Sequence, residues 1–255
     1  KSVGYVLKQK ENYDLIHTST YSAMIPSYIL SVLKGIPTLL NVHEIWSLNE
    51  WLEFTKSKGF FYFTEERMLF KLPFSVYVSP SYHTKKDLTK LGVDGKKIFV
   101  IPHGIDRKLF NPNMKRFRKY IRGLYKIGDK EIIGCFIGKP TIFKGINYLL
   151  DAIQNVAKKT DVRFIFLLSE LHRTAYENFI ERISKNMALK KHIILARYQN
   201  SHDFVGKIIG ASDFVVMPSL TEGFGFVAAE AASIGIPIIV TKDTSLTEVI
   251  DHKKH

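Results

Sequence analysis

Residues 218–241 read PSLTEGFGFVAAEAASIGIPIIVT, and the order of the segments in this part of the chain indicates the fold class. A GFG turn at 223–225 stands between the apolar run DFVVMP (213–218) and the helix-forming run FVAAEAASIG (226–235). A second apolar run, IPIIVT (236–241), follows immediately. The order strand, tight turn, helix, strand is the repeating unit of a doubly wound α/β domain. The stretch therefore predicts an α/β protein with a parallel sheet.

The turn itself has the properties of a phosphate site. Gly223 and Gly225 allow the backbone to bend sharply and to approach a ligand closely. The helix that begins near Phe226 directs its free N–H groups and the positive end of its dipole at the turn, which suits a phosphate. The alternative is a strand–glycine–helix turn that binds nothing, because such turns are common in α/β domains.

Two carboxylates accompany the turn, Glu222 within it and Glu230 eight positions later on the helix. That spacing allows both to face one crevice. Carboxylates near a helix start often lie on a solvated face as dipole partners. Glu230, however, lies between alanines at 228, 229, 231 and 232. Such a small, apolar surrounding indicates close packing, so the Glu230 carboxylate needs a partner, and a pair of sugar hydroxyls would serve.

The stretch closely resembles the donor-site motif of GT-B glycosyltransferases of the large retaining family 4 (group 1), P-S-x-x-E-G-F-G-x-x-x-x-E-A-x-A-x-G-x-P. The chain matches this motif at Pro218, Ser219, Glu222, Gly223, Phe224, Gly225, Glu230, Ala231, Gly235 and Pro237. The resemblance implies the GT-B fold, in which two Rossmann-like, doubly wound parallel-sheet domains face a crevice. It covers residues 14–250, and because both ends of the family pattern are missing, we expect the N-terminal domain to be incomplete.

Composition limits the class of protein. The chain has 255 residues, 45% of them hydrophobic, without an apolar run of the roughly 20 residues that a membrane span needs. This length allows two domains of ordinary size. The single cysteine, Cys135, excludes an internal disulfide and lies in the apolar run IIGCFIG, so we interpret it as a core residue rather than a nucleophile. These features favour a reducing compartment, and we predict a cytoplasmic protein.

The net charge of +13 is concentrated in the first half, where residues 1–127 hold 21 Lys and Arg against 10 Asp and Glu. An excess of this kind indicates an anionic partner, such as membrane phospholipid, a phosphate-bearing acceptor or nucleic acid. We hypothesise that this basic, aromatic half docks peripherally on an anionic membrane and receives a glycan or lipid-linked acceptor. We do not expect nucleic acid, because no recognised nucleic-acid motif is present. A solvated, Lys-rich surface without a partner is the alternative.

Three segments are expected along the chain. Residues 1–106 form an acceptor-side Rossmann-like domain that ends at IPHGID, a match to the family's segment at this point. In that match, His103 and Asp106 are interpreted as shaping the interdomain turn. Residues 107–130 form a basic connecting segment, whose part at 107–126 has eight basic residues and no acidic one. Residues 131–255 form the nucleotide-sugar-binding domain.

Each predicted domain alternates strands with helices, as a parallel sheet requires. Strands are predicted at 14–17, 36–43, 74–79 and 97–102 in the first domain and at 131–138, 162–168, 192–196, 213–218 and 236–241 in the second. Helices are predicted at 21–34, 81–91, 144–158, 172–187, 202–210 and 226–235, and residues 46–71 are mostly helical in pattern.

A second loop carries chemistry. The segment GKPTIFKG (138–145) resembles the family's G-R-L-x-x-x-K-G loop, whose Arg and Lys bind the donor diphosphate. The resemblance assigns Gly138, Lys139 and Lys144 to donor binding, and Lys144 to catalysis as well. Lys139 stands where the family usually has arginine, and a lysine cannot form the bidentate fork of a guanidinium group. Two solvated lysines are the alternative interpretation.

The resemblance also assigns roles within the first motif. Glu222 would bind sugar hydroxyls and act in catalysis, and Glu230 would bind the ribose hydroxyls of the donor nucleotide. The backbone amides of Gly223, Phe224 and Gly225 would neutralise the diphosphate.

Two further positions follow predicted strands. His43, in NVHEIW, lies at the carboxyl edge of a strand, where open α/β sheets place their sites. It resembles the family's H-D/E position, which implies contact with the transferred sugar and a catalytic role; a purely structural histidine is the alternative. The segment RYQN (197–200) stands where the family contacts the nucleotide base. There Arg197 replaces the usual glycine, and Tyr198 could stack on a base.

These interpretations predict a retaining glycosyltransferase that transfers a sugar from a nucleotide diphosphate sugar. We expect no metal, because no D-x-D motif stands at the expected strand end, and two lysines and a helix start can neutralise the diphosphate. No cofactor is expected beyond the donor substrate itself. The alternatives are a non-catalytic module that binds nucleotide sugars or nucleic acid, and a phosphorylase on the GT-B scaffold.

Overall fold

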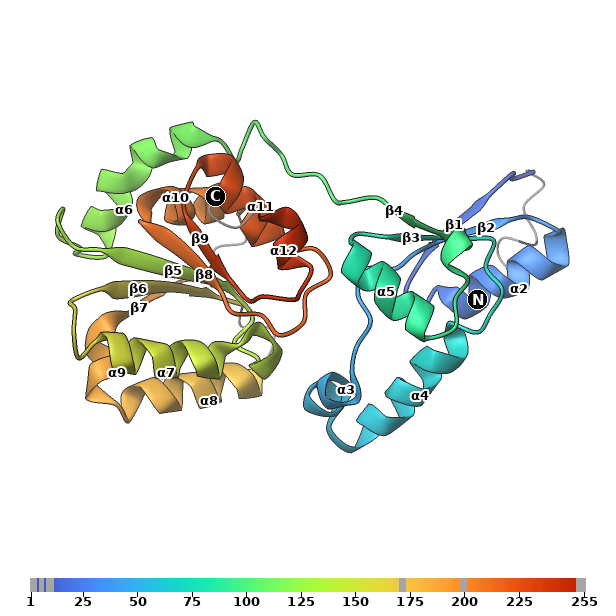
Figure 1. The fold of residues 1–255 in the computed structure, drawn as a ribbon, viewed down its shortest axis with the longest axis horizontal. Helices are drawn as coiled ribbons and strands as arrows, with labels where there is room; N and C mark the ends of the chain where they lie inside the picture. The colour runs from blue at the N-terminus through green and yellow to red at the C-terminus, as the bar shows by residue number, and fades with distance from the viewer. Residues whose placement is uncertain (1–3, 5–6, 8–11, 170–172, 198–200, 251–255) are drawn as a thin grey trace. The chain divides into compact units, whose positions relative to one another are not determined.

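The computed structural model describes residues 4, 7, 12–169, 173–197 and 201–250. The chain divides into two compact units, Lys1–His103 and Gly104–His255, and each is described by itself (Figure 1). In the described part of the chain, no helix is long and apolar enough to cross a membrane.

The first unit is a four-stranded parallel sheet with helical connections between successive strands. Its strand order, β1-β2-β3-β4, follows the sequence. The elements are β1 (Ile16–Ser19), α2 (Met24–Lys34), β2 (Thr38–Asn41), α3 (Leu48–Thr55), η1 (Lys56–Lys58), α4 (Gly59–Leu69), β3 (Val76–Ser79), α5 (Tyr82–Lys90), η2 (Gly95–Lys97) and β4 (Ile98–Val100). Its core gathers Leu40, Phe74 and Leu88, each fully buried. The four strands predicted for this part of the chain are all confirmed, each shorter than predicted or shifted by up to two residues.

The second unit is a five-stranded parallel sheet in the order β7-β6-β5-β8-β9. Its elements are η3 (Pro112–Phe117), α6 (Arg118–Leu124), β5 (Ile133–Gly138), η4 (Ile142–Lys144), α7 (Ile146–Val156), β6 (Arg163–Leu168), α8 (Arg173–Ser184), α9 (Met187–His192), β7 (Ile193–Ala196), α10 (His202–Ala211), β8 (Phe214–Met217), α11 (Phe226–Ile234), β9 (Ile238–Val240) and α12 (Leu246–Val249). The doubly wound sheet predicted from residues 213–241 is confirmed.

Helices cover both faces of this second sheet, with α7, α8 and α9 on one face and α6, α10 and α11 on the other (Figure 1). Alternation along the strands produces the two layers, because successive side chains of a strand point to opposite faces. In β6, Ile165 belongs to the core beneath α10, whereas Phe166 belongs to the core beneath α7. Cys135 is fully buried in the first of these cores, where burial raises the pKa of its thiol to about 12. It is therefore a core residue, as expected.

The helix predicted over 172–187 is wrong at its end, because two helices share this region. Helix α8 ends at Ser184, and α9 runs from Met187 to His192. The Asn186 side chain accepts a hydrogen bond from the backbone N–H of Leu189 at 3.1 Å, so Asn186 caps a new helix. The strand predicted from residue 192 accordingly begins one residue later.

The basic segment 107–126 is folded into the second unit. Phe110, Met114 and Ile121 are buried in its core, and η3 and α6 pack on α10. Arg122 is 2% exposed and donates hydrogen bonds to the backbone carbonyl oxygens of Gly128 and Glu131. Arg118 forms an ion pair with Asp213 at 2.7 Å. Part of the positive charge therefore stabilises this unit internally.

Candidate donor site

Two loops of the second unit meet at the carboxyl ends of β5 and β8, which are neighbours in the sheet. Strand β5 also pairs with β6 on its other side, so the chain winds outward in both directions from β5. In open α/β sheets, ligands bind at the carboxyl edge where the winding reverses. Both loops that the sequence assigned to the donor, 138–145 and 218–225, begin at this edge.

The backbones of these loops touch. Gly145 has a φ of +67°, and a Cβ atom at this position would lie 1.9 Å from the carbonyl oxygen of Pro218. The N–H of Leu220 donates to the carbonyl oxygen of Phe143 at 2.7 Å. Glycine is therefore required at 145 both for its conformation and for the close approach.

An ion pair joins the side chains of the two loops. The Lys144 ammonium donates a hydrogen bond to Oε2 of Glu222 at 2.7 Å, and both side chains are partly buried. Ser245 fixes the same loop from another side, because its hydroxyl donates to the backbone carbonyl oxygen of Glu222. The structure thus brings together the lysine and the glutamate that the sequence placed in the catalytic group.

Helix α11 begins beside this ion pair. Gly225, the N-cap residue that precedes the helix, has a φ of +97°, and a Cβ atom there would lie 2.3 Å from Cδ2 of Leu246. No side chain caps the start of α11. The first N–H groups of the helix, with the positive end of its dipole, therefore point toward the GFG turn, where an anion would be stabilised.

Glu230, at the middle of α11, is 6% exposed. Among the residues that the structure describes, no side chain or backbone N–H donates a hydrogen bond to its carboxylate. Burial raises the pKa of Glu230 to about 7. A buried carboxylate without a donor is costly, which is the property expected of a group that waits for ligand hydroxyls.

Two other predicted donor residues lie on the same edge of the sheet. Lys139 follows β5 directly and is exposed, and Arg197 follows β7 and is exposed. Tyr198 lies outside the described residues.

In the first unit, His43 lies beyond the carboxyl end of β2 and is exposed. Its Nε2 is 3.0 Å from the hydroxyl oxygen of Ser19, the last residue of β1. The ring of His103 stacks on that of His43, with centroids 5.8 Å apart. Burial and the charge of His43 both lower the pKa of His103. Ser19 was not predicted; the pairing of β1 with β2 brings it beside the segment that follows β2.

Family models match nearly the whole chain. The model of the glycosyl transferases group 1 matches residues 118–255, and that of Glycosyltransferase Family 4 matches residues 5–109. The chain belongs to the group 1 glycosyltransferase family.

Curated relatives agree with this assignment. An Escherichia coli protein named UDP-Gal:alpha-D-GlcNAc-diphosphoundecaprenol alpha-1,3-galactosyltransferase is 29% identical over 245 residues, which are 93% of this chain and 60% of that protein. The MMP alpha-(1->4)-mannosyltransferase of Mycolicibacterium hassiacum is 23% identical over 95% of this chain and 56% of its own length. The chain thus spans about 60% of the length of these group 1 relatives.

Solved structures show the same fold. Anabaena Alr3699/HepE in complex with UDP-glucose superposes with a TM-score of 0.77 at 20% identity, over 98% of this chain and 65% of that one. Sucrose-phosphate synthase from Thermosynechococcus elongatus superposes with a TM-score of 0.74 at 20% identity, over 96% of this chain and 59% of that one. With its two parallel-sheet α/β units, this group 1 member has the GT-B fold predicted from its sequence.

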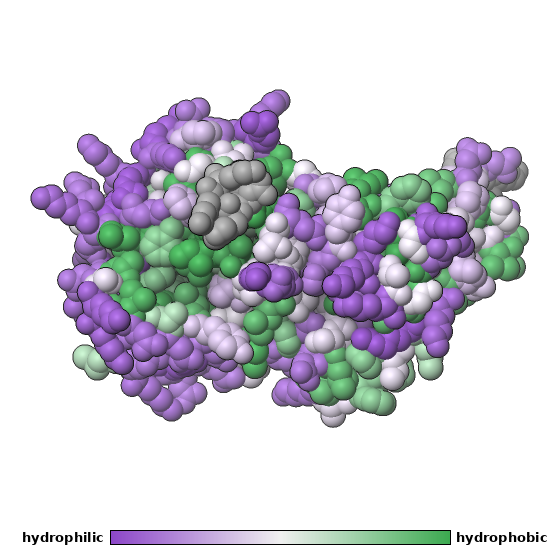
Figure 2. All heavy atoms as spheres, viewed as in Figure 1, coloured by the Kyte–Doolittle hydropathy of each residue, from purple (hydrophilic) through white to green (hydrophobic). Residues whose placement is uncertain are grey.

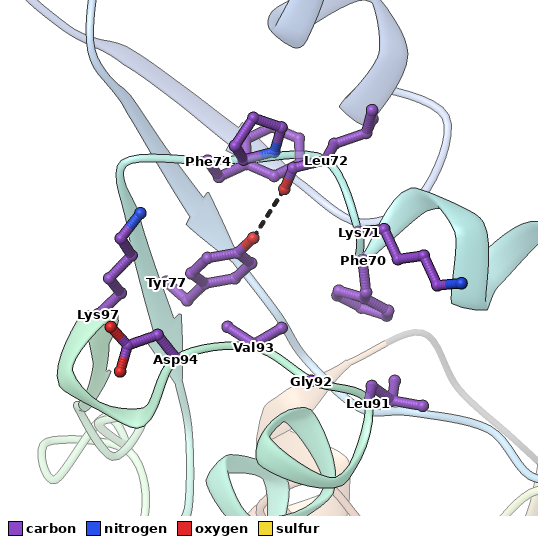
Figure 3. Close-up of a pocket in the computed structure, with 11 residues that line it drawn as sticks. Phe70, Lys71, Leu72, Phe74, Tyr77, Leu91, Gly92, Val93, Asp94 and Lys97 are labelled. Carbon is purple, nitrogen blue, oxygen red and sulfur yellow. Dashed lines mark hydrogen bonds between the residues drawn. The ribbon is translucent and has the colours of Figure 1, made fainter.

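A cavity of about 460 Å³ lies elsewhere, in the first unit. Its lining comes from residues 70–74, which precede β3, from residues 91–94 and Lys97, which precede β4, and from Tyr77 (Figure 3). The Tyr77 hydroxyl donates to the carbonyl oxygen of Leu72 at 2.9 Å. This cavity is at the amino edge of the sheet, opposite the edge where open α/β sheets bind ligands, and it contains none of the predicted site residues.

Proposed function

We propose that this chain is part of a retaining glycosyltransferase that transfers a sugar from a nucleotide diphosphate sugar. The observation that carries the proposal is the meeting of Lys144 and Glu222 at the switch point of the second sheet. The buried Glu230 carboxylate on the adjoining helix, to which no described residue donates a hydrogen bond, supports it.

The roles follow from the chemistry of these groups. A lysine ammonium has three N–H donors, so Lys144 can keep Glu222 as a partner and still bind a phosphate oxygen. Lys139 and the first amides of α11 would add further positive charge to the same diphosphate. Glu222 would hold hydroxyls of the transferred sugar, and Glu230 would accept hydrogen bonds from the two ribose hydroxyls.

In the proposed reaction, the bond between sugar C1 and the diphosphate oxygen breaks with its electron pair going to the phosphate. The acceptor oxygen forms its bond to C1 on the same face, and its proton passes to the departing phosphate oxygen. Configuration at C1 is therefore retained, and no enzyme nucleophile is needed. His43 would contact the transferred sugar. Because fixed protein charges stabilise the leaving diphosphate, we propose that transfer is independent of metal.

The acceptor is proposed to be a glycan or a lipid-linked sugar. The Escherichia coli relative is named for a diphosphoundecaprenol-linked acceptor, and the Mycolicibacterium relative is named as a mannosyltransferase. A lipid-linked acceptor requires work at a membrane surface. We therefore propose a cytoplasmic protein in peripheral contact with an anionic membrane.

Calorimetric titration with UDP, GDP, ADP and their common sugar conjugates tests the donor site. We expect one nucleotide to bind and Glu230→Ala to weaken it. The matched control is Glu177→Ala, which removes an exposed carboxylate of α8 paired with Arg173, and which should bind like wild type. If no nucleotide binds, or if Glu230→Ala binds equally well, the proposed site is wrong.

The stereochemical part has its own test. With the donor so identified, proton NMR of the first product formed should show the anomeric configuration of the donor. An inverted product would contradict the retaining mechanism while leaving the donor site standing.

A further inference from the structure

A helical hairpin of the first unit carries large apolar side chains on its outside. Helices α3 and α4 pack against each other and are joined by the short turn η1. We call residues 52–61, which include this turn, the hairpin tip. The exposed apolar residues of the hairpin tip are Leu52 (38%), Phe54 (54%), Phe60 (63%) and Phe61 (63%). Figure 2 shows hydrophobic side chains at the surface in the region that α3 and α4 occupy in Figure 1.

The interior of the hairpin is formed mainly by other residues, and the exposed rings meet it edge-on, Phe54 against Trp46 with ring centroids 5.3 Å apart and Phe61 against Tyr62 at 5.6 Å. Trp51 stacks on Tyr62 with centroids 5.4 Å apart, and its indole N–H donates to Glu66 at 3.2 Å. Glu66 also accepts the backbone N–H of Trp46 at 3.3 Å. A Cβ atom at Gly59 would lie 2.4 Å from the backbone nitrogen of Leu52, so the two helices are in backbone contact. The two helices of the hairpin are thus tightly packed against each other, and most of the apolar surface of the hairpin tip remains exposed to water.

Positive charge accompanies this apolar surface. Lys56 and Lys58 are exposed in η1, between Phe54 and Phe60. Within 52–61 these two lysines stand against one acidic residue, Glu53. Residues 1–103 as a whole contain 13 Lys and Arg against nine Asp and Glu. Aromatic and aliphatic side chains interleaved with lysines match a membrane interface, where rings enter the acyl boundary and ammonium groups meet anionic headgroups.

We propose that the hairpin tip inserts into the headgroup region of a bilayer that contains anionic lipid. The inference rests on the proposed function, because it names the surface by which a lipid-linked acceptor would be approached. Helix α4 has 11 residues and is therefore about 16 Å long, which suits shallow insertion rather than a span. The exposed lysines Lys56 and Lys58, which lie between the exposed rings, favour an anionic bilayer over an apolar protein partner.

Vesicle binding of the full chain tests this proposal without any substrate. Sedimentation is compared for vesicles of phosphatidylcholine alone and with 30 mol% phosphatidylglycerol, a composition about as anionic as the surfaces that basic segments bind. We expect binding to the anionic vesicles only. The double variant Phe60→Ser/Phe61→Ser should weaken it at least tenfold. Lys56→Ser/Lys58→Ser should weaken it less and should remove most of its dependence on salt.

The matched control is Val32→Ser/Leu33→Ser on α2, which removes two apolar side chains of the same unit that are 64% and 59% exposed. This control should bind vesicles like wild type. The depth of insertion of the hairpin tip is measured with Phe60→Trp. The fluorescence of the new tryptophan should be quenched by lipids that are brominated on the acyl chain. Unchanged circular dichroism shows that each variant is folded.

The proposal is overturned if wild type does not bind anionic vesicles at low salt, or if the tip variants bind as well as the control. It is also overturned if the protein forms a concentration-dependent dimer whether or not vesicles are present, and the tip variants abolish that dimer. Because nucleotide titration is measured separately, failure here leaves the donor site intact, and failure of the donor site leaves vesicle binding to be judged by itself.

Discussion

The two sheets end differently at their carboxyl edges. In the second unit, the loops after β5 and β8 are locked together by a backbone hydrogen bond, a glycine in contact with a carbonyl oxygen and the ion pair of Lys144 with Glu222. In the first unit, Ser19 and His43 share one exposed hydrogen bond, His43 stacks on His103, and the Tyr21 hydroxyl donates to the backbone carbonyl oxygen of Glu44 at 3.0 Å.

This difference suits different tasks. A diphosphate has high charge and fixed geometry, and charged groups stabilise it best when they are already oriented before it arrives. The His43 side chain, with its exposed hydrogen bond to Ser19, can adjust its position at little cost. We infer that the second unit is organised for the donor in advance and that His43 takes its final position with substrate.

The largest effect is expected for Lys144→Ala. The variant loses a cation at the proposed diphosphate and leaves Glu222 without its partner. Transfer should fall at least about 100-fold, on the order of 3 kcal/mol of transition-state stabilisation. The control is Lys185→Ala, which removes an exposed ion pair with Glu181. The measurement is the steady-state rate of transfer at saturating donor. An undiminished rate in Lys144→Ala would show that this lysine has no catalytic role.

A smaller effect is expected from the contact between the loops. Gly145 and Gly35 have nearly equal φ values, +67° and +66°, but a Cβ atom at Gly35 would meet nothing within 4 Å. Gly35→Ala should therefore cost about 1 kcal/mol of unfolding free energy from its conformation alone. Gly145→Ala should cost about 2 kcal/mol more, because the loops must separate. Urea titration measures both, and equal losses would show that the loop contact stabilises nothing.

The smallest effect is expected at the other edge. Ser19→Ala removes an exposed hydrogen bond to His43 and should change the free energy of unfolding by less than about 0.5 kcal/mol. Nucleotide affinity should not change. A loss above about 1 kcal/mol in the same urea titration would mean that the first edge is as firmly built as the second.

Much of this organisation could be predicted from the sequence. The run 213–241 has apolar segments of strand length on both sides of a glycine turn and a helix-forming segment, so strand, turn and helix follow from local chemistry. The burial of Glu230 could be anticipated for the same reason, since its neighbours in sequence are alanines. The two-domain GT-B fold was predicted from the match to a family motif, not from local chemistry.

Contacts between distant residues could not be predicted. Lys144 and Glu222 are 78 positions apart, and they meet because β5 and β8 are paired in a fixed register. The burial of Phe110 and Met114 was hidden by the basic residues around them. The break between α8 and α9 depends on one asparagine cap, which a helical pattern does not reveal.

The central claim is that the buried Glu230 carboxylate receives the donor nucleotide. Its pKa is raised from an ordinary 4.5 to about 7, so the free protein holds a proton there below neutral pH. Ribose hydroxyls would donate to the carboxylate and lower this pKa, so binding must release the proton. Affinity should therefore increase as pH rises from about 5 and level off above about 7.

The same shift predicts a stability change of definite sign. The unfolded state ionises Glu230 near pH 4.5, whereas the folded state resists ionisation up to about pH 7. The free-energy cost of burying the charged carboxylate is therefore absent below about pH 4.5, grows between pH 4.5 and about 7, and is fully present above pH 7. Glu230→Gln should remove it and stabilise the free protein at pH 8 by up to about 3 kcal/mol.

The most direct measurement is calorimetry of the bound nucleotide diphosphate sugar near pH 6.5, in two buffers that differ in ionisation enthalpy. The diphosphate of such a donor does not titrate in this range, so any proton exchanged comes from the protein. Wild type should release a substantial fraction of one proton, and Glu230→Gln should release none. Equal proton release by both proteins, or none by wild type, would contradict the central claim.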